Sequence, residues 1–228
     1  MADMKKIVLS LGGSLIVPDE INSAFLKKFR ELILSKIDEY QFVIVCGGGK
    51  TARRYQDGGA AVTDMTSEQL DWLGIYSSHL NAHLVQSVFA ENARNEIVVD
   101  YDQQIELNTP ITIGAGWKPG HSTDFDAVQI AINIGAERVV NLSNIEYVYD
   151  KDPKEHADAV ILKDLTWADF RKIVGDVWTP GLNMPFDPIA SKLAEEHKLE
   201  VIIANGGNIE NIGAIINGSE FIGSVIHP

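Results

Sequence analysis

Short apolar runs and amphipathic stretches alternate along most of the chain. Residues 7–11 and 42–46 form apolar runs with the length and β-branched content of buried strands. Between them, apolar residues at helical spacing predict a helix that begins at Asn22 or Ser23 and ends near Asp38. A strand, a helix and another strand in this order need a crossover connection, so the pattern predicts a parallel sheet.

The same alternation continues to the end of the chain. A helix is expected after Gly49, with a break at residues 57–59, and a long helix over residues 66–92 follows. The other expected strands are 96–99, 110–114, 138–142, 201–204 and a terminal pair around 221–226, and the other expected helices are 126–134, 165–174, 187–197 and 208–217. Residues 179–185 are expected to form a flexible loop. The pattern as a whole predicts an α/β fold.

Two of the expected helices carry further signals. Thr166 and Asp169 form a capping-box variant at the start of the helix 165–174. The long helix exceeds the average length, and residues such as Trp72 and Tyr76 widen its apolar side. That side either packs in the core or meets another subunit, and the sequence favours neither.

The composition fits a soluble globular protein. A chain of 228 residues can form one large α/β domain or two small lobes, and no stretch of it resembles a linker. The single cysteine, Cys46, lies in a predicted buried strand, which excludes a disulfide framework and favours a reducing compartment. The first apolar run is too short for a signal peptide or a membrane span. We therefore expect a cytoplasmic protein.

The net charge narrows the class of ligand. At a formal net charge of −13, the chain lacks the broad basic surface that nucleic acids or anionic membranes require. An acidic protein that binds phosphates must concentrate its positive charge locally, and Lys50, Arg53 and Arg54 meet that need. The expected partner is therefore small.

The glycines at 47–49 carry the main functional signal. They follow a predicted buried strand and precede a predicted helix. Residues without side chains let backbone N–H groups approach an anion, and a helix N-terminus adds partial positive charge. We interpret the segment as a phosphate-binding turn, with an ordinary tight loop as the alternative. A second strand with a glycine turn, at Gly12 and Gly13, favours the first interpretation. A P-loop is excluded because that motif requires glycine where this chain has Ile44.

The loop at residues 114–124 offers a second set of hydrogen-bond donors. Residues 120–123 place backbone and hydroxyl donors before a predicted helix. Asp124 is placed to cap that helix or to orient a charge. His121 has either a structural role or a role in binding a ligand.

Other candidate sites have common structural explanations. Asp100, Asp102 and Glu106 could hold a metal ion, although a solvated edge is the commoner cause of such a cluster. Tyr147 and Tyr149 could flank a flat base, although packing in an exposed hairpin explains them equally well. Cys and His residues show no zinc-type spacing, and no Ser-His-Asp arrangement can be assigned.

Several short motifs are distributed over nearly the whole chain. They are LGGS at 11–14, CGGGKTAR at 46–53, LDWLGI at 70–75, PGHSTD at 119–124, YDKDP at 149–153, DPIASK at 187–192 and the terminal GSVIHP. In this order they resemble the amino acid kinase superfamily and, within it, the archaeal-type uridylate (UMP) kinases. The resemblance implies a three-layer αβα sandwich around a mainly parallel sheet. It also implies one domain over residues 1–228, in which residues 1–125 approximately bind the acceptor and residues 126–228 bind ATP.

The resemblance further implies an activity and its residues. The activity is ATP-dependent phosphorylation of UMP to UDP, with Mg²⁺ bound together with ATP. No metal site formed by the protein alone is implied. The implied assembly is a homo-oligomer, either a dimer or a hexamer. The implied ATP-binding residues are Gly13, Ser14, Gly49, Arg53, Ser143, Tyr149 and Asp152. The implied UMP-binding residues are Gly48, Asp71, Trp117, Lys118, Pro119, Gly120, His121, Ser122 and Thr123. Asp71 would bind the ribose hydroxyls, Lys192 would neutralise the transferring phosphoryl group, and Asp124 would organise the centre.

The chain also departs from the pattern of that superfamily. Ser10 stands where many members have lysine, Trp117-Lys118 replace an expected Thr-His pair, and Glu146-Tyr147 replace Asp-Gly. Two alternatives therefore stay open. One is a kinase of the same fold that phosphorylates an acyl carboxylate or isopentenyl phosphate, and the missing histidine near the triglycine turn counts against isopentenyl phosphate. The other is a relative that binds nucleotides or oxyanions without catalysis.

Overall fold

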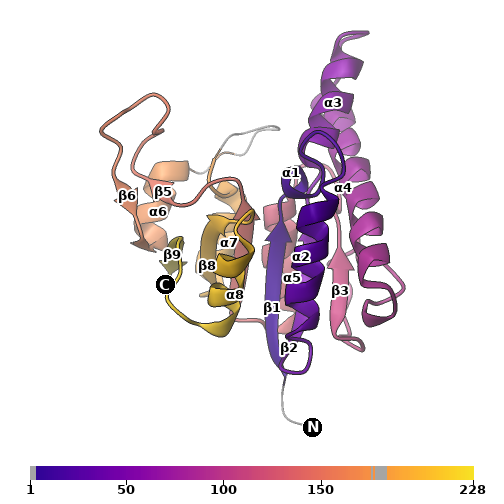
Figure 1. The fold of residues 1–228 in the computed structure, drawn as a ribbon. Helices are drawn as coiled ribbons and strands as arrows, with labels where there is room; N and C mark the ends of the chain where they lie inside the picture. Colours follow the sequence, from indigo (N-terminus) through magenta and orange to yellow (C-terminus); the bar gives the residue numbers. More distant parts are fainter. Residues whose placement is uncertain (1–3, 176, 178–183) are drawn as a thin grey trace.

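A seven-stranded sheet runs through the molecule, with helices on both of its faces (Figure 1). The computed structural model describes residues 4–175, 177 and 184–228. In spatial order the strands are β3 (Ile111–Gly114), β2 (Tyr40–Cys46), β1 (Lys5–Leu11), β4 (Arg138–Ser143), β8 (Glu200–Asn205), β9 (Ser224–His227) and β7 (Asp164–Thr166). The first five are parallel, whereas β9 runs antiparallel to β8 and parallel to β7. The prediction of a mainly parallel sheet is therefore confirmed.

The helices form one layer on each side of this sheet. One layer contains α1 (Gly13–Ile16), α2 (Ser23–Leu34), α4 (Ser67–Phe89) and α8 (Ile209–Asn217), and the other contains α5 (Thr123–Ile134), α6 (Trp167–Val174) and α7 (Pro188–Glu196). A short 3₁₀ helix, η1 (Ala90–Asn92), follows α4. Helix α3 (Gly49–Ala60) packs on α4 and projects beyond the carboxyl ends of the strands (Figure 1). The predicted three-layer αβα arrangement is confirmed, and no helix in the described residues is both long and apolar enough to cross a membrane.

Side-chain alternation along the strands builds a separate core on each face. In β1, Leu9 and Leu11 pack in the layer that contains α2, while Val8 packs in the layer that contains α5. Ser10 also points to the α5 side, where its hydroxyl donates a hydrogen bond to Asp124 at 3.0 Å. The carboxyl end of this central strand therefore supplies a polar group in an otherwise apolar run.

The break predicted at residues 57–59 is wrong, because α3 continues through both glycines to Ala60. A Cβ at Gly59 would lie only 2.5 Å from the sulfur of Met65, which leads into α4. The Met65 side chain therefore packs against the bare backbone of α3 here and would have to shift if residue 59 carried a Cβ. The helix tolerates the low helical propensity of glycine because α3 packs along α4.

The predicted strands at residues 96–99 and around 221–226 differ from the structure. The first segment forms only an isolated bridge to β3, in which the Val98 N–H donates to Ile113 O at 2.9 Å. At the C-terminus a single strand, β9, replaces the expected pair. The side chain of Asn211 forms hydrogen bonds with both the N–H and the C=O of Ile222, each at 2.7 Å. The polar backbone groups of Ile222 therefore have partners without pairing to another strand.

The region before α6 contains short strands that the pattern did not predict. Strands β5 (Val148–Tyr149) and β6 (Ile161–Leu162) form a separate antiparallel pair, and β7 joins the edge of the main sheet. Two or three residues are too few to show a strand periodicity. The predicted cap of α6 is confirmed, since Thr166 Oγ1 accepts the Asp169 N–H at 3.2 Å. Most of the loop predicted at 179–185 lies outside the described residues.

Two glycine turns pack against each other at the carboxyl ends of β1 and β2. A Cβ on Gly13 would lie 2.3 Å from Gly47 O and 2.6 Å from Gly49 N. A Cβ on Gly49 would lie 2.3 Å from Gly13 C, and Gly49 has a φ of +58°, which favours glycine. Asn81 Nδ2 from α4 donates to Gly47 O at 2.8 Å and holds the second turn in place. Contact between the two turns is therefore backbone against backbone.

We expect Gly49→Ala to lower the free energy of unfolding by more than about 2 kcal/mol, because it combines a backbone clash with an unfavourable φ. The matched control is Gly58→Ala in the same helix, where a Cβ would meet no atom within 4 Å. That control should be neutral or stabilise the protein by up to about 1 kcal/mol. Urea unfolding measures both changes, and equal stability of the two variants would contradict the role given to the paired turns.

Candidate active site

The main candidate site is a cavity of about 650 Å³ at the carboxyl ends of the central parallel strands. Open α/β sheets commonly bind ligands at this edge. The N-terminal half contributes both glycine turns, Ser10, Ser14 and Arg53, and α5 contributes Thr123 and Asp124. The other half contributes a wall that includes Asn141, Ser143, Asn144, Ile145, Tyr147, Tyr149, Asp152, Lys154 and Ile173. The cavity therefore joins segments that lie far apart in the sequence.

All seven residues predicted to bind ATP line this cavity. Gly13, Ser14, Gly49 and Arg53 lie on one side, and Ser143, Tyr149 and Asp152 lie on the other. Of the residues predicted to bind UMP, Gly48 and Thr123 also line it, next to the predicted organiser Asp124. The structure thus brings these predicted residues together, while their contacts with nucleotides stay predictions.

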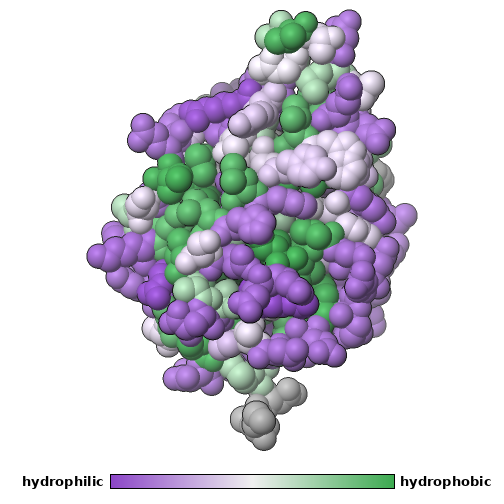
Figure 2. All heavy atoms as spheres, turned by 90° about the vertical axis from the view of Figure 1, so that its right-hand side faces the viewer, coloured by the Kyte–Doolittle hydropathy of each residue, from purple (hydrophilic) through white to green (hydrophobic). Residues whose placement is uncertain are grey.

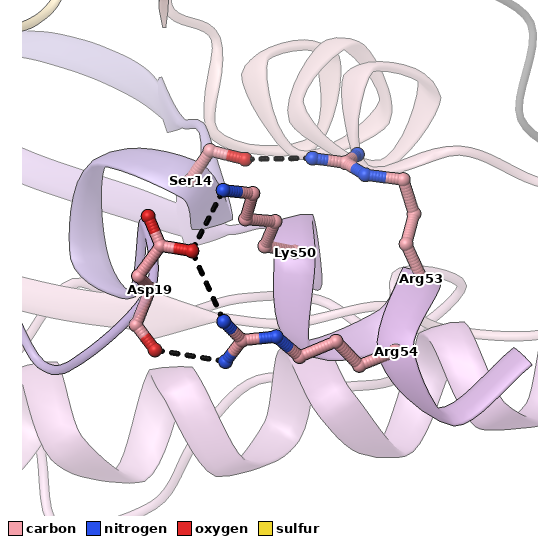
Figure 3. A network of polar contacts seen from close by, with 5 residues as sticks. All are labelled: Ser14, Asp19, Lys50, Arg53 and Arg54. Carbon is pink, nitrogen blue, oxygen red and sulfur yellow. Dashed lines mark hydrogen bonds and ion pairs between the residues drawn. The ribbon is translucent and has the colours of Figure 1, made fainter. Parts of the chain in front are cut away.

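The three basic residues at the start of α3 have different environments (Figure 3). Arg53 lines the cavity and donates to Ser14 Oγ at 2.9 Å. Lys50 and Arg54 instead form ion pairs with Asp19, at 2.8 and 3.1 Å. One carboxylate offsets one of these two positive charges, so the segment keeps a local excess of positive charge, and of the three basic residues Arg53 is the one that lines the cavity.

Asp124 is the acidic group at the centre of the cavity floor. Its Oδ1 accepts hydrogen bonds from Ser10 Oγ at 3.0 Å and from Asn141 Nδ2 at 2.7 Å. Burial, and then the nearby Asp187 carboxylate, raise the pKa of Asp124 to about 7. These hydrogen bonds and one from the Asp187 backbone act in the opposite direction. Asp124 does not cap α5, since Ser122 Oγ accepts the Phe125 N–H instead.

The loop predicted to receive the acceptor, residues 117–123, lies beside this cavity and is held by three carboxylates. Asp71 Oδ2 on α4 accepts the Gly120 N–H at 2.8 Å. Asp126 Oδ2 accepts the Trp117 N–H at 3.2 Å, and Ser122 Oγ donates a short hydrogen bond to Asp187. Asp71 and the loop therefore come together as predicted, although only Thr123 of the loop lines the cavity.

Rings pack along one side of the same loop. The ring of His121 stacks on Phe125 with centroids 4.2 Å apart and lies 5.4 Å from Trp117. Burial and the neighbouring Lys118 lower the pKa of His121, so the neutral imidazole is favoured. Lys118 Nζ lies 3.4 Å from the centroid of the Trp117 ring. The Trp-Lys pair that departs from the superfamily pattern thus forms a cation–π contact.

Lys192 is not placed at the cavity. It is exposed on α7 and is not among the residues that line the site.

Asn141 and Lys154 line the cavity and were not among the predicted residues. Asn141 could have been found from the sequence, because it is a polar residue near the carboxyl end of a buried strand.

The described residues contain no group of three His, Cys, Asp or Glu side chains arranged to hold a metal ion. The acidic cluster near residue 100 has other partners. Asp100 accepts hydrogen bonds from the Asp102 N–H and the Gln103 amide, and Asp102 lies 3.8 Å from Lys118. These contacts favour a solvated edge over a metal site.

Comparisons with known proteins agree with this geometry. The Amino acid kinase family matches residues 5–205. A uridylate kinase from Methanococcus aeolicus is 34% identical over 98% of this chain and 100% of its own length. A uridylate kinase from Methanobrevibacter smithii is 31% identical over 94% of this chain and 96% of its own.

Similarity to a solved structure extends over the same length. The crystal structure of uridylate kinase from Archaeoglobus fulgidus has a TM-score of 0.82 and 32% identity, and the match covers 97% of this chain and 99% of that one. A UMP kinase from Ureaplasma parvum, at 17% identity and a TM-score of 0.77, shares the fold. With the paired glycine turns, the cavity between the halves and these full-length matches, the chain belongs to the amino acid kinase family.

Proposed function

We propose that this protein transfers the γ-phosphoryl group of ATP to UMP and so forms UDP. The observation that carries the proposal is the full-length similarity to archaeal uridylate kinases, at 30–34% identity. The cavity beside the paired glycine turns supports it, because backbone amides and one free arginine suit phosphate groups. A cytoplasmic location is part of the proposal and fits the single buried cysteine, Cys46.

In this proposal the two halves of the domain bind different nucleotides. ATP binds between the glycine turns and the wall that carries Ser143, Tyr149 and Asp152, with its base near the apolar and aromatic residues of that wall. UMP binds across Gly48 and the loop 117–123. Asp71 keeps one oxygen on the Gly120 N–H, and its other oxygen can accept a ribose hydroxyl.

The chemistry requires alignment and charge neutralisation rather than a strong base. The attacking phosphate oxygen of UMP is already ionised, so it needs no proton removed. Arg53 and the glycine-turn amides stabilise negative charge on the phosphates. Asp124 lines the cavity and would hold Mg²⁺ together with phosphate oxygens, a donor set that this ion commonly accepts. When bound, Mg²⁺ supplies further charge neutralisation. The role of Lys192 stays a prediction from the resemblance.

The acceptor is tested by a coupled assay of ADP formation with UMP, CMP, acetylglutamate and isopentenyl phosphate. We expect kcat/KM to be highest for UMP. Turnover of another acceptor without UMP turnover would overturn the acceptor assignment. ATP binding by calorimetry without phosphoryl transfer to any acceptor would overturn the enzymatic proposal.

We expect Arg53→Ala to raise KM for ATP by about tenfold or more, because a charge-assisted phosphate contact is lost. Arg54→Ala is the matched control, since Arg54 is adjacent in sequence and pairs with Asp19 away from the cavity. The control should change KM for ATP by less than about twofold. Steady-state kinetics measure KM for ATP, and thermal unfolding shows whether either variant is less stable. Equal increases in KM for ATP in both variants would contradict the phosphate-binding role proposed for Arg53.

The pKa of Asp124 predicts a pH dependence of stability. The pKa of Asp124 is about 7 in the folded state and 3.8 for the free group, so the folded state binds more protons than the unfolded state between pH 4 and 7. The free energy of unfolding should therefore decrease by about 1.4 kcal/mol for each unit by which the pH rises within this window. In Asp124→Asn this contribution disappears, so urea unfolding between pH 5 and 8 should show a flatter profile. Asp64→Asn, in the exposed connection between α3 and α4, is the control and should retain the wild-type slope.

We also infer a homo-oligomer formed through the exposed side of α4. Trp72, Tyr76 and Leu80 recur every four residues and are 37%, 62% and 63% exposed. Figure 2 shows this side of the molecule, where apolar and aromatic side chains interrupt the hydrophilic surface. A stripe of this kind is typical of a contact surface.

Replacing Tyr76 and Leu80 with Asp should therefore reduce the mass measured by sedimentation equilibrium to that of a monomer, because buried unpaired charges are unfavourable. Val160→Asp is the control, since Val160 is 56% exposed at the other end of the sheet, before β6. A monomeric wild type, or an unchanged mass in the double variant, would contradict the inferred interface.

A further inference from the structure

Asp126 is a carboxyl group in an unusual environment. It lies in α5, two residues after Asp124, and is fully buried. Its Oδ2 accepts the Trp117 N–H at 3.2 Å. Its Oδ1 has no hydrogen-bond partner among the described residues, although a buried polar oxygen without a partner is unfavourable. The presence of a buried carboxyl group with one unpartnered oxygen near the start of α5 needs a specific explanation.

The hydrogen bond to Trp117 fixes the first residue of the loop 117–123. The other two carboxylate contacts hold later positions, at Gly120 and Ser122. Without Asp126 the partly buried backbone N–H of Trp117 would lose the acceptor that the structure gives it. The beginning of the loop therefore depends on this side chain.

The orientation of Trp117 in turn fixes its neighbours. Its ring lies 5.9 Å from the ring of Tyr101 and 5.4 Å from that of His121, and Lys118 lies over its face. Tyr101 is fully buried and donates a short hydrogen bond to Ala115 O, so it forms a rigid support for the ring. A shift of Trp117 would therefore also move the His121 ring and the Lys118 ammonium group, which pack against it.

We propose that Asp126 is a positioning residue that holds the loop 117–123 in the conformation that binds the acceptor nucleotide. The inference rests on the proposed UMP kinase activity. The contact that carries this role is the hydrogen bond from the Trp117 N–H to Asp126 Oδ2. The charged groups nearby are Asp124, Asp187 and Lys118.

Asn keeps the size of Asp126 and an oxygen that can accept a hydrogen bond, whereas Leu keeps a similar size without any acceptor. Asp126→Asn keeps an oxygen that can accept the Trp117 N–H, so KM for UMP should stay within about twofold of the wild type. Asp126→Leu removes that acceptor, and KM for UMP should rise by about tenfold while KM for ATP stays within about twofold. Steady-state kinetics with each substrate varied in turn measure this difference.

The control for a general packing defect is Ile130→Val, one turn further along α5, where the side chain is also fully buried. It should lower thermal stability without changing either KM. Equal increases in both KM values in Asp126→Leu would indicate a structural defect alone and overturn the proposal. Impairment of Asp126→Asn as severe as that of Asp126→Leu would also overturn it, because an oxygen able to accept the Trp117 N–H would then not restore binding.

Amide hydrogen exchange tests the loop contact without turnover. The Trp117 amide should be protected in the wild type and in Asp126→Asn, and should lose protection by about tenfold in Asp126→Leu but not in Ile130→Val. If the wild type does not turn over UMP, the proposed function fails, and this exchange pattern alone decides whether Asp126 holds the loop. An unprotected Trp117 amide in the wild type would overturn the proposal, whether or not Asp126→Leu folds.

Discussion

The contact between two stretches of bare backbone at the ends of β1 and β2 determines the rest of the site. Gly13 and Gly49 approach so closely that neither position has room for a Cβ. The contact brings the start of α1 and the start of α3 to the same edge of the sheet, next to the cavity. The proposed binding of phosphates beside these turns therefore depends on the absence of side chains there.

Which basic side chains can bind an anion in the cavity depends on the partner of each one, and not simply on how many basic residues lie nearby. Lys50 and Arg54 are close to the glycine turn in sequence, but Asp19 pairs with both. Lys6 donates to the last carbonyl of α5, at Ile134 O, and so stabilises a helix C-terminus far from the cavity. Among the residues that the structure describes, the partner of Arg53 is the neutral hydroxyl of Ser14, so Arg53 remains able to bind an anion.

Local sequence patterns predicted much of the fold because buried strands and helix caps are local features. The apolar runs that form β1 and β2, and the cap at Thr166, are examples. The continuation of α3 through Gly58 and Gly59 could not be predicted, because it depends on packing against α4. The pairing of Lys50 with Asp19 joins residues 31 positions apart and leaves no mark in either local sequence. The predicted residues that line the cavity came mainly from the resemblance, and Asn141 could have been added from its place near the carboxyl end of β4.

Ser10 places a neutral hydroxyl beside Asp124, at a position where many members of the superfamily have lysine and the compact kinases that this chain resembles often lack it. A lysine ammonium group at this position would favour the ionised carboxylate and lower its pKa. Ser10 supplies only a neutral hydrogen bond at 3.0 Å, and burial beside Asp187 instead raises the pKa to about 7. A cationic ligand that bound near Asp124 would favour the ionised form, so its binding would release a proton. By linkage, the affinity for such a ligand must increase with pH up to about 7, and the same carboxyl group thus couples ligand binding to the pH dependence of folding.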